Sequence, residues 1–115
     1  MKQYNAYDEL LGLLNPGEVV EAIVLGRGRW ERWPDGEDPR GLLPADVVGV
    51  PLSLADAEPH MRTWRFGGGH GQACNRPAVV WTDSRIIAVG EYDGATRLVS
   101  LPRHPAVYIP ENIGG

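Results

Sequence analysis

The stretch Ala78-Val-Val-Trp-Thr-Asp-Ser-Arg-Ile-Ile-Ala-Val-Gly-Glu-Tyr-Asp-Gly-Ala-Thr-Arg-Leu-Val-Ser-Leu101 decides the fold. Its three runs at 78–82, 85–92 and 96–101 are rich in Val, Ile, Trp and Tyr, which are side chains that favour strands. Asp83-Ser84 and Asp93-Gly94 separate the runs, and Asp-Gly is among the strongest short signals for a β-hairpin. The sequence therefore predicts a C-terminal three-stranded antiparallel meander.

Helical patterns are confined to two short segments upstream of this meander. A helix over 5–14 is indicated by an Asn5 cap and by an apolar stripe at helical spacing, made of Tyr7, Leu10, Leu11 and Leu14. A second helix is expected over 53–61, with Ser53 as its cap and Pro59 limiting or kinking it.

Two further strands are expected between these segments and the meander. Residues 18–25 form a mostly apolar run after the helix-ending Asn15-Pro16-Gly17, and 63–66 is a short run that enters a glycine-rich loop. Residues 26–46 contain too many Gly and Pro for a regular element and are predicted to be a long surface excursion.

Length and composition agree with a small turn-rich domain. The 115 residues suffice for one domain, 1–115, and glycine and proline together make up 25 of them. This content argues against a helical bundle. We therefore predict an α+β fold, mainly antiparallel β, that forms a small barrel or sandwich with the meander and one or two short helices.

Two segments resemble the bacterial pleckstrin-homology-like domains. Leu14-Asn15-Pro16-Gly17-Glu18, with the apolar strand after it, is similar to their leucine-x-x-glycine-glutamate opening. The run from Val80 to Val89 is similar to their threonine-aspartate-x-arginine hairpin, and Arg97 to Pro102 to their next strand. The resemblance covers about a third of the chain. It implies a small β-barrel or sandwich used for binding or assembly, with no catalytic residues to transfer.

The charge distribution limits the classes of partner. The net charge of −4 disfavours long nucleic acids and acidic membrane surfaces. Between Glu58 and Asp83 there is no carboxylate, and the basic side chains in this window are His60, Arg62, Arg65, His70 and Arg76. Binding of one small anion is therefore the electrostatic possibility that the sequence leaves open.

The glycine-rich loop inside this window is the leading candidate site. Consecutive glycines let the backbone approach a ligand and direct several N–H groups at one anion, arginines add charge-assisted hydrogen bonds, and an indole stacks on a base. The predicted ligand-binding residues are Trp64, Arg65, Gly68, Gly69, His70, Gln72, Asn75 and Arg76. The bland alternative is a hairpin tip with solvated arginines and a core tryptophan.

A second candidate surface lies in the long excursion. Tryptophan and arginine are enriched at binding hot spots, and here they occur together among Pro and Gly as Arg27, Arg29, Trp30, Arg32 and Trp33. The alternative is that the two tryptophans fold back onto the sheet.

Catalytic and metal signatures are weak. Cys74 has no partner thiol, so it supports neither a disulfide nor a thiolate zinc site, and nothing in the sequence fixes the geometry of a pair such as His70 and His104. We expect no catalytic residues, no metal and no cofactor.

These observations lead to three functional hypotheses. The first is a non-enzymatic module that sequesters or senses a small anionic ligand, with a nucleotide as the leading example. The second is a small cytosolic inhibitor or assembly factor, for example of the phage counter-defence type, that binds a protein partner through the Trp/Arg surface. The third is a small histidine-based phosphodiesterase. A cytoplasmic location is expected because no leader and no membrane-spanning run is visible. Homo-oligomerisation stays open.

Overall fold

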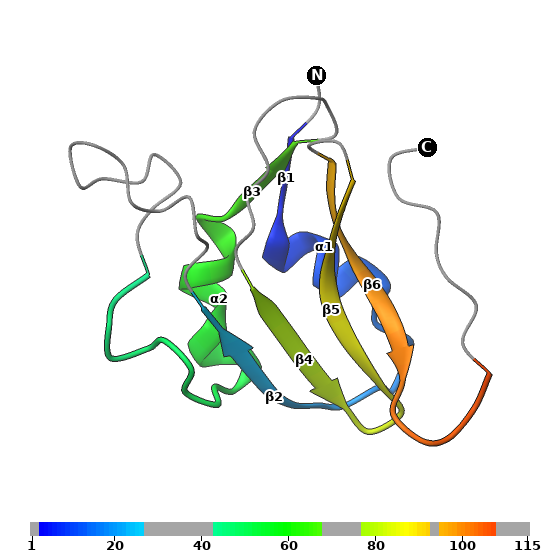
Figure 1. Ribbon diagram of the computed structural model, residues 1–115. Helices are drawn as coiled ribbons and strands as arrows, with labels where there is room; N and C mark the ends of the chain where they lie inside the picture. Colours follow the sequence, from blue (N-terminus) through cyan, green and yellow to red (C-terminus); the bar gives the residue numbers. More distant parts are fainter. Residues whose placement is uncertain (1–2, 27–42, 68–76, 93–94, 108–115) are drawn as a thin grey trace.

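A four-stranded antiparallel sheet in the order β2-β4-β5-β6 organises the protein (Figure 1). The structure, a computed structural model, describes residues 3–26, 43–67, 77–92 and 95–107. The strands of this sheet are β2 (Val20–Leu25), β4 (Ala78–Thr82), β5 (Arg85–Tyr92) and β6 (Ala95–Pro102). The last three are consecutive neighbours, so the predicted meander is confirmed.

The predicted α+β fold, mainly antiparallel β with a C-terminal meander, is confirmed, and of the two forms expected for it, barrel or sandwich, the closed barrel is not formed. The sheet's two edge strands, β2 and β6, contact different parts of the chain along their free edges. Along the free edge of β2, the backbone N–H of Ile23 donates to the Leu52 carbonyl and the Leu52 N–H donates to the Ile23 carbonyl, both at 2.8 Å. Along the free edge of β6, the Leu98 N–H donates to the Glu9 carboxylate at 3.2 Å. Each edge strand forms hydrogen bonds with a different segment, and β2 and β6 do not pair with each other.

Both predicted helices are present, and their capping residues are those expected. Helix α1 (Ala6–Leu13) begins after Asn5, whose side chain accepts the Asp8 N–H at 2.8 Å. Helix α2 (Leu54–Arg62) begins after Ser53, which accepts the Asp56 N–H at 3.0 Å, and it continues past Pro59. The predicted apolar stripe of α1 needs one correction, because Leu11 is 42% exposed.

A small two-stranded sheet joins the N-terminus to the segment after α2. Strand β1 (Gln3–Asn5) runs antiparallel to β3 (Arg65–Gly67), with Tyr4 opposite Phe66. The sequence analysis missed β1, since three residues are too few to show an alternating pattern.

The core lies between one face of the four-stranded sheet and the two helices, which lie on the same side of it (Figure 1). Inward-facing residues Ile23, Val80 and Ile87 of three neighbouring strands are fully buried, as are Leu10 of α1 and Met61 of α2. We call this the inner face of the sheet and the opposite side the outer face. In the described part of the chain, no helix is long and apolar enough to span a bilayer.

Candidate functional site

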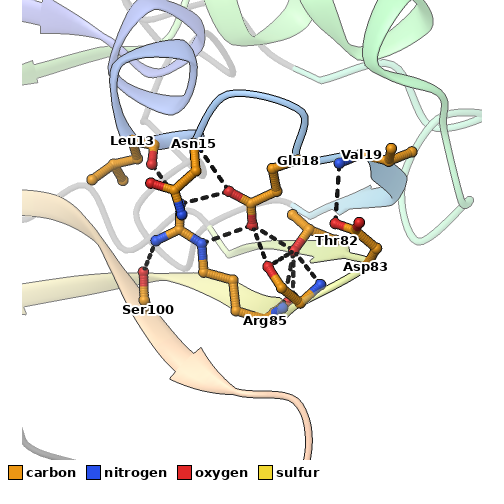
Figure 2. A network of polar contacts seen from close by, with 9 residues as sticks. Leu13, Asn15, Glu18, Val19, Thr82, Asp83, Arg85 and Ser100 are labelled. Carbon is orange, nitrogen blue, oxygen red and sulfur yellow. Dashed lines mark hydrogen bonds and ion pairs between the residues drawn. The ribbon is translucent and has the colours of Figure 1, made fainter.

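A buried ion pair lies at one end of the inner face (Figure 2). Glu18, in the loop between α1 and β2, pairs with Arg85, the first residue of β5. Arg85 Nε and Nη2 donate to the two carboxylate oxygens of Glu18, both at 2.8 Å, so the contact is bidentate. The Glu18 side chain is only 2% exposed. A carboxylate with so little access to water is stable as an ion only if its lone pairs are satisfied by other groups.

Neighbouring groups satisfy both members of this pair (Figure 2). Glu18 also accepts hydrogen bonds from the hydroxyls of Thr82 at 2.7 Å and Ser84 at 3.0 Å, and from the Asn15 N–H at 3.0 Å. The other donors of Arg85 bind the Ser100 hydroxyl at 2.7 Å and the Leu13 carbonyl. These contacts tie the end of α1 and the loop after it to β4, β5 and β6. We call this group the Glu18–Arg85 clamp.

The chemistry of the clamp is structural. The Arg85 guanidinium holds the pKa of Glu18 far below its ordinary range, and this effect outweighs burial, which acts in the opposite direction. A carboxylate with such a low pKa stays ionised near neutral pH, so it has no proton to donate and is a weak general base. The Arg85 contacts drawn in Figure 2 are with protein groups, namely the Glu18 carboxylate, the Ser100 hydroxyl and the Leu13 carbonyl.

The clamp joins the two segments on which the family resemblance was based. Glu18 closes the first, while Thr82 and Arg85 belong to the second. The sequence analysis named both segments without predicting their contact. A usable signal was present, because Glu18 is the one charged residue of the first segment and Arg85 is the one cation of the second, and each lies beside an apolar strand. The resemblance to the pleckstrin-homology-like family itself stays a prediction.

The outer face of the four-stranded sheet is the second feature that the sequence analysis did not identify. Side chains of paired residues in an antiparallel sheet lie on the same face, so the register defines the rows that cross it. One row contains Ala22, Trp81, Ile86 and Leu101, and the next contains Val24, Val79, Ala88 and Val99. All eight side chains are apolar, and all are partly exposed.

Polar groups and glycine flank these two rows. Beyond the Trp81 row, Arg103 makes an ion pair with Glu21 and donates to the Thr82 carbonyl, which links the chain after β6 to β4 and β2. Beyond the Val79 row, Gly90 lies opposite the exposed Arg97. None of the eight belongs to the buried core or to the partly buried side chains packed against it. They form a separate apolar surface of the sheet.

The structure describes only part of the predicted ligand-binding loop. Trp64 is 1% exposed and lies in the core, so its indole is a packing group and not an open surface for a base. The backbone of Arg65 pairs with Asn5 in the small sheet. The other predicted ligand-binding residues lie outside the described residues: Gly68, Gly69, His70, Gln72, Asn75 and Arg76. The same holds for Arg27, Arg29, Trp30, Arg32 and Trp33 and for Cys74.

One cation of the carboxylate-free window is already paired. Arg62 Nε donates to Glu58 at 2.6 Å, and its Nη1 lies 3.3 Å from Asp8. The guanidinium carbon also lies 4.5 Å from the centre of the Tyr7 ring. Carboxylates from outside the sequence window therefore reach into it, and the local positive charge is smaller than the sequence indicates.

Comparisons with known proteins add no homology to this picture. No family model matches the sequence, and neither curated proteins nor solved structures give a significant match. Among the described residues, no group of three or more His, Cys, Asp or Glu side chains could hold a metal ion.

Proposed function

We propose that this protein is a non-enzymatic interaction module that binds a protein partner through the outer face of its four-stranded sheet. One observation carries the proposal, namely the two in-register rows of apolar, partly exposed side chains centred on Trp81 and Val79. An antiparallel sheet with one covered face usually turns polar side chains outward on the other. Contiguous apolar surface on a folded protein is typical of interaction sites.

The other features of the fold support this choice. The Glu18–Arg85 clamp uses its charges internally, so it explains stability and offers no reactive group. Strand addition at the sheet edges is opposed where Leu52 covers β2 and Glu9 covers β6. Within residues 3–26, 43–67, 77–92 and 95–107, these contacts leave the outer face accessible to a partner.

The proposal can be tested with Nile red, a neutral dye that fluoresces strongly on apolar surfaces. The native protein at micromolar concentration should bind the dye, and Val79→Lys should weaken this fluorescence several-fold because it places an ammonium in the centre of the face. Leu11→Lys is the matched control, since Leu11 is an exposed apolar residue of α1, on the other side of the sheet. No dye binding by the native protein, or equal loss in both variants, would contradict the proposal.

Small-anion binding is the rival function, and a thermal-shift panel separates the two. Inorganic phosphate, mononucleotides and cyclic dinucleotides should leave the melting temperature of the protein unchanged if the outer face is the functional surface. A shift of several degrees that is lost in an Arg65→Ala, Arg76→Ala double variant would favour the glycine-rich loop instead, because each charge-assisted hydrogen bond contributes about 1.5–3 kcal/mol.

A further inference from the structure

We draw no further inference here: the strongest candidate, the apolar outer face of the four-stranded sheet centred on Trp81 and Val79, already carries the proposed function, and nothing in residues 3–26, 43–67, 77–92 and 95–107 shows which occupant covers it.

Discussion

The two faces of the four-stranded sheet are both apolar, but the helices bury the inner face and leave the side chains of the outer face partly exposed. On the inner face, Ile87 is fully buried beneath the helices, and the polar end of that face is closed by the Glu18–Arg85 clamp. On the outer face, the adjacent Ile86 stands in a row of apolar side chains that stay partly exposed. The comparison teaches that the apolar residues of a strand show which side chains could be buried, whereas the packing of the helices decides which of them are buried.

The largest loss of stability is expected when the partly buried cation of the Glu18–Arg85 clamp is removed. Arg85→Ala leaves Glu18 as a buried charge without its main partner, so the free energy of unfolding should fall by about 3–5 kcal/mol. Arg85→Lys keeps the charge and loses the bidentate contact, so its loss should be smaller. Urea denaturation followed by circular dichroism measures both. Arg97→Ala removes an exposed arginine and should cost less than about 0.5 kcal/mol. An equal loss for Arg85→Ala and Arg97→Ala would show that the clamp does not stabilise the fold.

The same clamp predicts how stability depends on pH. The pKa of Glu18 is lower in the folded protein than in the unfolded chain, so the unfolded chain binds a proton more readily. The stabilisation from Glu18 is therefore complete above about pH 5 and decreases as the pH falls below the ordinary glutamate value of about 4.3. Glu18→Gln should be less stable at neutral pH and should lose less stability than the wild type between about pH 5 and pH 3. Parallel urea titrations across this range would reveal a difference, and identical slopes would contradict it.

The same substitution, isoleucine to alanine, at the adjacent positions Ile86 and Ile87 compares the stability contributed by the two faces. Ile87→Ala should lower the free energy of unfolding by about 3 kcal/mol, because it leaves a cavity in the core. Ile86→Ala should lower it by less than about 1 kcal/mol in dilute protein, where its side chain keeps contact with water. Urea denaturation at micromolar concentration compares the pair. Equal losses would mean that the outer face is covered within one chain.

The smallest expected effect concerns the edge of β6, where the two faces meet. Glu9→Ala removes the acceptor of the Leu98 N–H and should lower stability by about 1 kcal/mol. Glu9→Gln keeps a carbonyl oxygen at the same place and should retain most of that stability. Amide hydrogen exchange at Leu98 should speed up in the alanine variant relative to the glutamine variant. Unchanged exchange in both would show that Glu9 does not protect this edge.

Much of the local structure could be predicted because local chemistry specifies it. Asn5 and Ser53 cap their helices through side-chain oxygens that reach N–H groups three residues ahead. The meander follows from β-favouring runs separated by turn residues. The sequence left a barrel and a sandwich as alternatives, because closure of the sheet depends on what contacts β2 and β6, and those contacts come from distant parts of the chain.

The candidate site could not be predicted to the same degree. The sequence analysis concentrated on residues 64–76, because this segment combines a glycine-rich run with basic side chains and contains no carboxylate. It left open whether Trp64 lies in the core or lines a pocket, and it could not foresee that Asp8 would approach Arg62 from 54 positions away. The Glu18–Arg85 pair is a similar long-range contact, which forms because the loop before β2 meets the start of β5 at one end of the sheet.

By itself, the sequence determined both helices and every strand of the four-stranded sheet, because alternation, capping and turn chemistry act between neighbours in the chain. Only the tertiary structure decided which side of the sheet is inside. In Ala78–Thr82 every residue up to Trp81 is apolar, so the pattern does not distinguish Val80, which is buried, from Val79, which is partly exposed. The side on which α1 and α2 pack settles that choice, since burial is a property of the contacts between layers and not of a strand alone.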